Sequence, residues 1–141
     1  MKHFIVALLF IIGIVSVLAG CSNTEPSAAN DFLVRDITAA EARVLIQENG
    51  DNPDFHTIDV RTASEYAAGH IAGAVNLDVN QTSFRDAVGD MDTEATYLVY
   101  CRTGNRSRTA LAVMQELGLR DIYHLEKGIV EWVSDGLPLA D

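Results

Sequence analysis

Short apolar segments alternate along this chain with segments of helical spacing, and this alternation restricts the fold more than any other feature. The expected strands lie at 57–60, 74–77, 96–100 and 121–125. The expected helices lie at 38–49, 62–69, 84–88, 107–117 and 128–133. Such alternation is typical of a single α/β domain in which a central parallel sheet carries helices on both faces. The segment 96–100 is the most apolar strand, so we expect it to be central.

Local signals mark the ends of several helices. Thr38 is followed three residues later by Glu41, and Thr62 by Glu65. This is the pattern of a capping box, in which each side chain bonds to the other residue's backbone. Gly118 follows the last of a run of helical residues and is well placed to end that helix.

A cysteine stands where the expected central strand ends and the next helix begins. The connecting segment is Cys101-Arg102-Thr103-Gly104-Asn105-Arg106-Ser107. The N-terminus of a helix presents unpaired N–H groups and a partial positive charge, so it favours anions. A thiol in this position is expected to have a pKa below the free value of about 8.5. The segment therefore predicts a nucleophilic thiolate at Cys101.

The first part of the chain has the pattern of an export signal. Lys2 and His3 precede an apolar run at 4–18, which ends in Leu18-Ala19-Gly20-Cys21. This ending resembles the bacterial lipobox, in which the cysteine is lipidated. We expect a lipoprotein signal peptide at 1–20, a lipid on Cys21, a flexible tether at 21–32 and the folded domain at 33–141. The alternative is an uncleaved anchor helix; the lipobox reading predicts an exported, membrane-anchored protein at the periplasmic face or cell surface.

The cysteine count and the charge narrow the function. If Cys21 carries lipid, Cys101 is the only thiol left, so no disulfide can form within the chain. Residues 21–141 hold nine basic and twenty acidic side chains, a net charge of −11 that argues against nucleic acid as a partner. Three of the nine basic residues lie at 102–108. This local positive charge suits a small anionic substrate, and one small domain can act as a monomer.

Several motifs resemble those of rhodanese-like domains. They are Ile58-Asp59-Val60-Arg61-Thr62, Glu65-Tyr66, Gly69-His70-Ile71-Ala72-Gly73-Ala74-Val75-Asn76, the stretch Val99 to Ser107, and Gly128-Ile129-Val130-Glu131-Trp132. The resemblance covers about 33–138. It implies a sulfurtransferase that moves sulfur from thiosulfate or a persulfide through a cysteine persulfide at Cys101, with no cofactor. The sulfur acceptor is not identified by it.

Sulfur transfer needs a thiolate that attacks a sulfur–sulfur bond and then holds the extra sulfur. Converging N–H groups of the loop can stabilise the anions involved. The expected substrate-binding residues are Arg102, Thr103, Gly104, Asn105, Arg106 and Ser107. The two arginines can donate to a sulfonate, while Ser107 can either cap the helix or bond to the sulfur.

Three further residues are expected to support the site without taking part in the chemistry. Asp59 is expected to support the loop or to pair with Arg61, and Arg61 is also spaced to pair with Glu65. His70 is interpreted as a packed, hydrogen-bonded histidine. The remaining histidines show no ligand spacing, so no metal site is predicted.

Two other functions use related features. Cysteine phosphatases and arsenate reductases also hold a thiolate in an anion-binding turn, but they have a Cys-x5-Arg pattern. Here Ser107 occupies that position and Arg106 comes one residue early, so the turn is smaller. A non-catalytic sulfur carrier or sensing module would share the persulfide, and it differs from an enzyme in transferring sulfur only to a specific protein.

Overall fold

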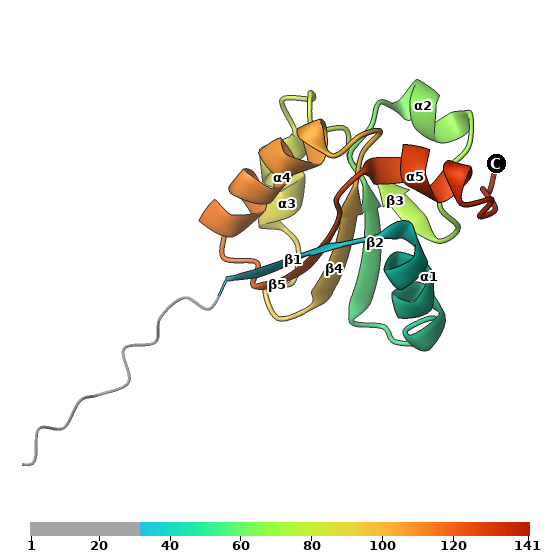
Figure 1. Ribbon diagram of the computed structural model, residues 1–141. Coiled ribbons are helices and arrows are strands. Elements are labelled where there is room, and N and C mark those ends of the chain that lie inside the picture. Colours follow the sequence, from blue (N-terminus) through green and yellow to red (C-terminus); the bar gives the residue numbers. More distant parts are fainter. Residues whose placement is uncertain (1–31) are drawn as a thin grey trace, which may run out of the picture.

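The computed structural model describes residues 32–141 and forms one parallel sheet of five strands, as Figure 1 shows. The strands are β1 (Leu33–Ile37), β2 (Phe55–Asp59), β3 (Ala74–Asn76), β4 (Thr96–Tyr100) and β5 (Asp121–Leu125). Their order across the sheet is β1-β5-β4-β2-β3, and every pair is parallel. The expected fold class is confirmed, and β4 is the central strand as predicted.

Helices cover both faces of the sheet (Figure 1). They are α1 (Ala39–Glu48), α2 (Ala63–Ala67), α3 (Phe84–Gly89), α4 (Asn105–Glu116) and α5 (Gly128–Ser134). Helices α3 and α4 pack against one face, and α1, α2 and α5 against the other. A parallel sheet covered in this way is buried on both sides, which explains why β4 is apolar at nearly every position.

Successive residues of β4 point into two separate cores. Val99 is fully buried in the core beneath α3 and α4, whereas Leu98 and Tyr100 are fully buried beneath α1 and α5. Side chains alternate between the faces of a strand, so one short segment supplies both cores. Cys101, directly after β4, belongs to the core beneath α3 and α4.

Strand β1 is a correction to the predicted fold, because the sequence pattern indicated no strand before residue 57. Strand β1 lies at an edge of the sheet and pairs only with β5, so its signal is weak. Charged Arg35 and Asp36 interrupt its apolar residues, and Leu33 is 47% exposed. The register of this pair places Asp36 beside His124, which matters for the site described below.

The predicted helix ends agree closely with the structure. Both capping boxes are present, at Thr38 with Glu41 and at Thr62 with Glu65. Gly118 has a left-handed φ of 88° directly after the C-cap of α4, which is a conformation that glycine adopts without strain. Helix α4 begins at Asn105, two residues earlier than the sequence indicated.

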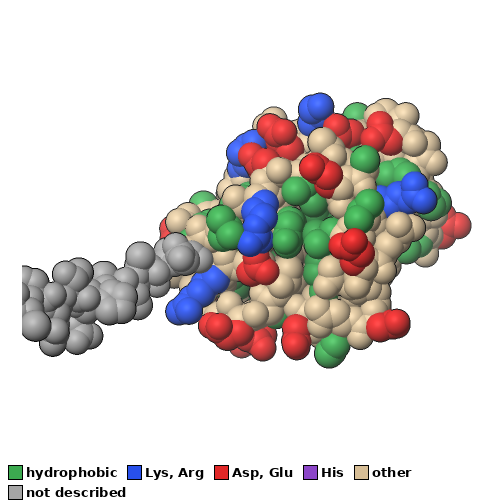
Figure 2. Space-filling view, turned by 60° about the horizontal axis from the view of Figure 1, so that its bottom comes forward, with side chains coloured by type: hydrophobic (Ala, Val, Ile, Leu, Met, Phe, Trp, Pro, Cys, Tyr) green, Lys and Arg blue, Asp and Glu red, His purple; other side chains and the backbone are tan. Residues whose placement is uncertain are grey.

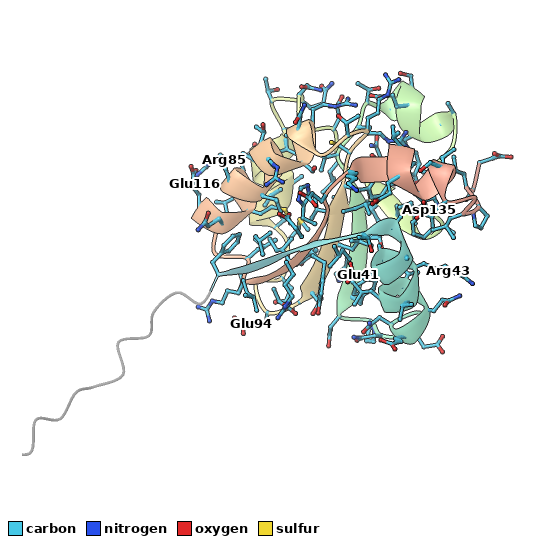
Figure 3. All side chains as sticks on the ribbon, viewed as in Figure 1. Glu41, Arg43, Arg85, Glu94, Glu116 and Asp135 are labelled. Carbon is cyan, nitrogen blue, oxygen red and sulfur yellow. The ribbon has the colours of Figure 1, made fainter. Side chains whose placement is uncertain are left out.

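Charged side chains occupy the outer surface. Figure 2 shows carboxylates spread over the face that it draws, with basic side chains among them. Arg85 of α3 and Glu116 of α4 form an exposed ion pair of 2.7 Å, and both are labelled in Figure 3. Within residues 32–141, no helix is long and apolar enough to cross a membrane. The predicted signal peptide, Cys21 and nearly all of the tether lie outside the described residues.

Candidate active site

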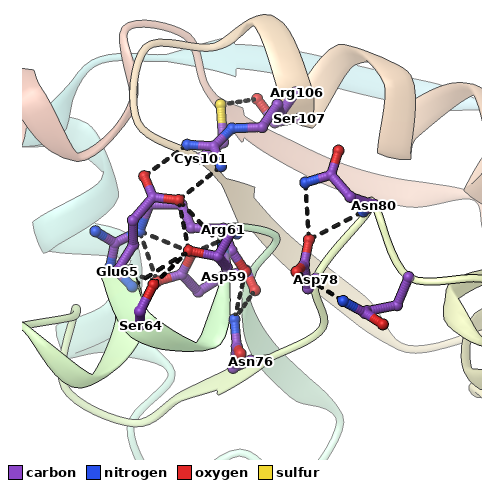
Figure 4. Close-up of polar contacts among 12 residues, drawn as sticks. Asp59, Arg61, Ser64, Glu65, Asn76, Asp78, Asn80, Cys101, Arg106 and Ser107 are labelled. Carbon is purple, nitrogen blue, oxygen red and sulfur yellow. Dashed lines mark hydrogen bonds and ion pairs between the residues drawn. The ribbon is translucent and has the colours of Figure 1, made fainter.

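Cys101 lies at the carboxyl end of the central strand, at the bottom of a tight loop. Gly104 ends this loop in a left-handed conformation with φ 92°, and α4 begins at the next residue. The Gly104 N–H donates to the sulfur over 3.2 Å. The Ser107 hydroxyl lies 3.4 Å from the sulfur, and Figure 4 draws this contact. Sites in open parallel sheets form at this edge, and donors here converge on one sulfur atom.

Two glycines allow the loop to pack against the N-terminus of α5. A Cβ on Gly104 would lie 2.0 Å from the carbonyl oxygen of Glu126, and one on Gly128 would lie 2.4 Å from that of Arg102. The N–H groups of Ile129 and Val130 donate to the carbonyls of Cys101 and Arg102, over 2.9 and 3.2 Å. The N–H groups of α5 thus satisfy the carbonyls of Cys101 and Arg102, while N–H groups of the loop can donate to the sulfur.

The surroundings of the thiol stabilise its anionic form. Burial raises the pKa of Cys101, which is only 1% exposed. Hydrogen bonds from the Ser107 side chain and from the N–H groups of Ser107, Thr103 and Gly104 lower it by more. The net pKa lies below the ordinary value, as the position at a helix N-terminus predicted.

The structure places the loop residues in different environments. Gly104 and Ser107 are buried beside the sulfur, and Thr103 and Asn105 are exposed. Ser107 does not cap α4, whose N-cap is Gly104; its hydroxyl contacts the sulfur instead. Arg102 is exposed and forms no ion pair among the described residues.

Arg106 is held by Glu65 of α2. Two of its nitrogens bind the two carboxylate oxygens, each over 2.7 Å, as Figure 4 shows. The same carboxylate completes the capping box at Thr62. A bidentate pair of this kind fixes the arginine in one orientation, so α2 is tied to the start of α4. Donation by Arg106 to a bound anion stays a prediction.

We expect Glu65→Gln to lower the free energy of unfolding by about 1–2 kcal/mol at neutral pH, because a partly exposed ion pair is lost while glutamine still caps α2. The hydrogen bonds from Arg106 lower the pKa of Glu65 from 4.5 to about 2. A carboxylate whose pKa is lowered by folding stabilises the folded protein fully at pH values above its ordinary pKa of 4.5. This stabilisation is lost as the pH falls from there through about 2.

Urea denaturation between about pH 3 and pH 7 measures this effect. The difference between wild type and Glu65→Gln should narrow toward the acidic end. Glu116→Gln, which breaks the exposed pair with Arg85, is the matched control and should cost less than about 0.5 kcal/mol. A difference for Glu65→Gln that is zero, or that widens in acid, would contradict the assignment.

Asp59 and Arg61 form a buried pair beside the loop. The Arg61 guanidinium donates to the Asp59 carboxylate over 2.6–3.0 Å and to the carbonyl of Gly69 over 2.8 Å. Arg61 therefore pairs with Asp59, and no ion pair with Glu65 forms. Asn76 donates to the carbonyls of residues 59 and 61 and fixes the end of β2. This cluster holds the segment that carries α2, and through it Glu65.

His70 is nearly buried and contacts neither the sulfur nor the loop. Its ring stacks on Tyr66 with a centroid distance of 3.8 Å, and Nδ1 lies 3.2 Å from the Tyr66 carbonyl oxygen. The ring is packed and hydrogen-bonded, but a role for His70 in supporting the site stays a prediction. Among residues 32–141, no group of three histidine, cysteine or acidic side chains is placed to hold a metal ion.

Two residues that the sequence did not single out, His124 and Asp36, extend the hydrogen bonds from Ser107. The Ser107 oxygen lies 2.7 Å from Nε2 of His124, and Nδ1 of His124 lies 2.6 Å from Oδ1 of Asp36. One signal was available for His124, because a polar residue that stands between Tyr123 and Leu125 in a buried strand must find partners there. Asp36 offered no signal, since its position depends on the pairing of β1 with β5.

A hollow of about 380 Å³ opens beside the loop. It is lined by Arg61, Glu65, Ala68, Gly69, Arg102, Ile129, Val130, Val133 and Leu139. Its wall is mostly apolar, and Arg102 is the residue of the Cys101–Ser107 loop that lines it. A hollow of about 470 Å³ between α1 and Tyr123 is lined by none of the loop residues.

Comparisons with known proteins agree with this geometry. The family described as "Rhodanese-like domain" matches residues 38–135. A protein named sulfurtransferase from Allochromatium vinosum is 29% identical over 104 residues, which cover 74% of this chain and 95% of that protein. A tRNA uridine(34) hydroxylase of Yersinia pestis is 35% identical over 99 residues, but the match spans only 27% of its length.

Solved structures show the same fold. A rhodanese-related protein from Thermoplasma volcanium has a TM-score of 0.61 at 30% identity, covering 75% of this chain and 97% of that one. A rhodanese-like domain protein from Staphylococcus aureus has a TM-score of 0.62 at 25% identity, covering 76% and 99%. The parallel sheet, the thiolate loop and these relatives agree: the chain belongs to the rhodanese-like domain family of sulfurtransferases.

Proposed function

We propose that the protein takes a sulfane sulfur from a small anionic donor, thiosulfate or a persulfide, and passes it to a thiophilic acceptor through a persulfide on Cys101. The observation that carries this proposal is the set of donors around one sulfur atom. The Gly104 N–H and the Ser107 hydroxyl lie 3.2 and 3.4 Å from it. Their hydrogen bonds favour the thiolate that must attack the donor.

The reaction divides into two displacements. The Cys101 thiolate attacks the outer sulfur of thiosulfate, a sulfur–sulfur bond forms, and the donor's sulfur–sulfur bond breaks with both electrons leaving on sulfite. An acceptor such as cyanide then attacks the outer sulfur of the persulfide, and the Cys101 thiolate leaves. Anions are present at each stage, so donors that are fixed beforehand in the loop lower the barrier without rearrangement.

The size of the loop supports sulfur over phosphate. Four residues separate Cys101 from Arg106, and that arginine is held by Glu65 in a bidentate pair. A phosphatase needs its loop arginine free to clamp two oxygens of a tetrahedral phosphate. Here the nearest converging donors reach a single sulfur atom, so the loop suits a persulfide.

We further propose that the domain acts as a monomer tethered by a lipid on Cys21 in an exported compartment. The support is in the sequence, where Leu18-Ala19-Gly20-Cys21 follows an apolar run. A lipid at this position would hold the sulfur site near a membrane surface and leave Cys101 as the only free thiol.

Thiosulfate is expected to add about 32 Da, the mass of one sulfur atom, to the peptide that contains Cys101. The measurement is mass spectrometry of protein extracted from cell membranes and digested after incubation with thiosulfate. The same spectra should show the lipid mass on the peptide that begins at Cys21. An unchanged Cys101 peptide during turnover with cyanide would rule out the persulfide, and loading without turnover would identify a carrier.

Hydrolysis of an aryl phosphate by the same preparation, with no transfer from thiosulfate to cyanide, would instead support the phosphatase alternative. The two assays use the same thiol, so they compare the substrates directly.

A further inference from the structure

Four side chains form a continuous hydrogen-bonded chain from the sulfur to the surface. The Ser107 oxygen lies 3.4 Å from the Cys101 sulfur and 2.7 Å from Nε2 of His124, and Nδ1 of His124 lies 2.6 Å from Asp36. Ser107 and His124 are fully buried, whereas the Asp36 side chain is 43% exposed. Cys101 itself is 1% exposed, so these side chains offer its thiol proton an acceptor inside the protein.

The Ser107 hydroxyl has a single proton, so it can donate to only one of its neighbours at a time. Its three candidate acceptors are the sulfur, the Gly104 carbonyl at 2.9 Å and Nε2 of His124. When His124 is neutral and its Nδ1–H faces Asp36, Nε2 accepts the hydroxyl proton, and none is left for the sulfur. When His124 is protonated, both nitrogens donate, and the hydroxyl can donate either to the Gly104 carbonyl or to the sulfur. A thiolate is charged and is therefore the stronger acceptor of the two.

We infer that Asp36 and His124 are positioning residues that ionise Cys101 through Ser107, an inference that rests on the function proposed above. The S–H bond of Cys101 breaks and its electron pair stays on the sulfur, while the proton forms an O–H bond at Ser107. The original Ser107 proton moves to Nε2 of His124. Thiol and imidazole thus become thiolate and imidazolium, and the Asp36 carboxylate accepts the Nδ1–H throughout.

The charges around His124 favour this product. Asp36 faces it from β1, and the hydrogen bond from His124 lowers the pKa of that carboxyl, which keeps it ionised. Arg108 of α4 lies 3.6 Å from the second Asp36 oxygen, and Glu126 lies 3.8 Å from Arg108. The Asp36 carboxylate therefore lies where it can accept the Nδ1–H of the imidazolium that the proposed proton transfer forms.

Asp36→Asn tests the proposed proton transfer from Cys101 through Ser107 to His124, which we call the relay. The relay and a purely electrostatic effect of the lost charge shift the ionisation midpoint of Cys101 in opposite directions. Removing a negative charge would by itself make the thiolate easier to form, so the midpoint of its ionisation would fall. The relay predicts the opposite, a rise of at least about one pH unit, because the imidazolium loses its partner. The midpoint is read from the rate of Cys101 alkylation by iodoacetamide and from the ultraviolet absorbance of the thiolate across pH.

The matched control is Glu126→Gln. It removes the same charge from the same part of the surface without a hydrogen bond to His124, so it should leave the midpoint unchanged or lower it slightly. Above the raised midpoint, Asp36→Asn should alkylate and transfer sulfur at the wild-type rate, since the thiolate then forms without help. A midpoint that stays or falls in Asp36→Asn would overturn the relay.

His124→Gln and Ser107→Ala locate the route. Each should raise the ionisation midpoint of Cys101. Asp36→Asn should shift the midpoint little further in the Ser107→Ala background, because that variant already lacks the hydroxyl that links Cys101 to His124. If Asp36→Asn shifts the midpoint equally in the wild-type and Ser107→Ala backgrounds, the relay is overturned. If His124→Gln does not fold, the result for Asp36→Asn alone tests the relay. Alkylation needs no sulfur donor, so the relay and the proposed sulfur transfer can fail separately.

Discussion

Replacing Cys101 with serine is expected to lower the rate of sulfur transfer from thiosulfate to cyanide at least about a thousandfold. A hydroxyl does not ionise near neutral pH, and it cannot hold a sulfane sulfur as a persulfide does. The fold should survive, because serine is smaller than cysteine and can still accept from the Gly104 N–H and the Ser107 hydroxyl. The measurement is the steady-state rate together with the thermal unfolding midpoint.

Cys101→Ala separates chemistry from structure. It removes the acceptor and leaves the donors that surround the sulfur without their partner, so it should unfold at a lower temperature than Cys101→Ser. Both variants should be equally inactive. Turnover within about tenfold of wild type in a folded Cys101→Ser protein would show that another group attacks the donor.

Features set by neighbouring residues could be predicted from the sequence. The apolar run at 96–100 identified the central strand, and Thr38 and Thr62 identified the starts of two helices. The low pKa of Cys101 also follows from local geometry, since its donors lie within six residues of it in the chain. The local features that favour the thiolate are the end of one strand, one glycine and the start of one helix.

Features set by distant pairing could not be predicted. Two charged residues interrupt the apolar residues of the edge strand β1, so its place beside β5 emerged only in the fold. Asp36 and His124 are 88 residues apart, and Arg106 and Glu65 are 41 apart. Nothing in their spacing pairs them. The sequence therefore indicated the thiol that we propose as the nucleophile, whereas the groups that contact Ser107 and Arg106 emerged only in the fold.

The N-terminus of helix α5 packs against the loop that carries Cys101. Gly128 makes this close approach possible because it has no side chain. Its φ is 66°, and a Cβ there would lie 2.4 Å from the carbonyl oxygen of Arg102 and 2.6 Å from that of Cys101. Gly136 has a similar φ of 72°, but a Cβ there would meet nothing within 4 Å. The two glycines differ only in what surrounds them, so they form a matched pair.

Gly128→Ala is expected to lower the free energy of unfolding by about 3 kcal/mol or more, whereas Gly136→Ala should cost about 1–2 kcal/mol, the strain of a left-handed alanine. The difference measures the close approach of α5 to the loop. Because the Ile129 and Val130 N–H groups hold the loop carbonyls, Gly128→Ala should also reduce sulfur transfer about a hundredfold.

Urea denaturation and the transfer rate of the folded fraction test both effects. The residual activity of Gly128→Ala should be accompanied by a higher midpoint for Cys101 alkylation, since displaced N–H groups no longer favour the thiolate. Gly136→Ala should keep the wild-type rate and midpoint. Equal losses in the two variants would mean that left-handed strain alone matters, and that the thiolate does not depend on the contact between α5 and the loop.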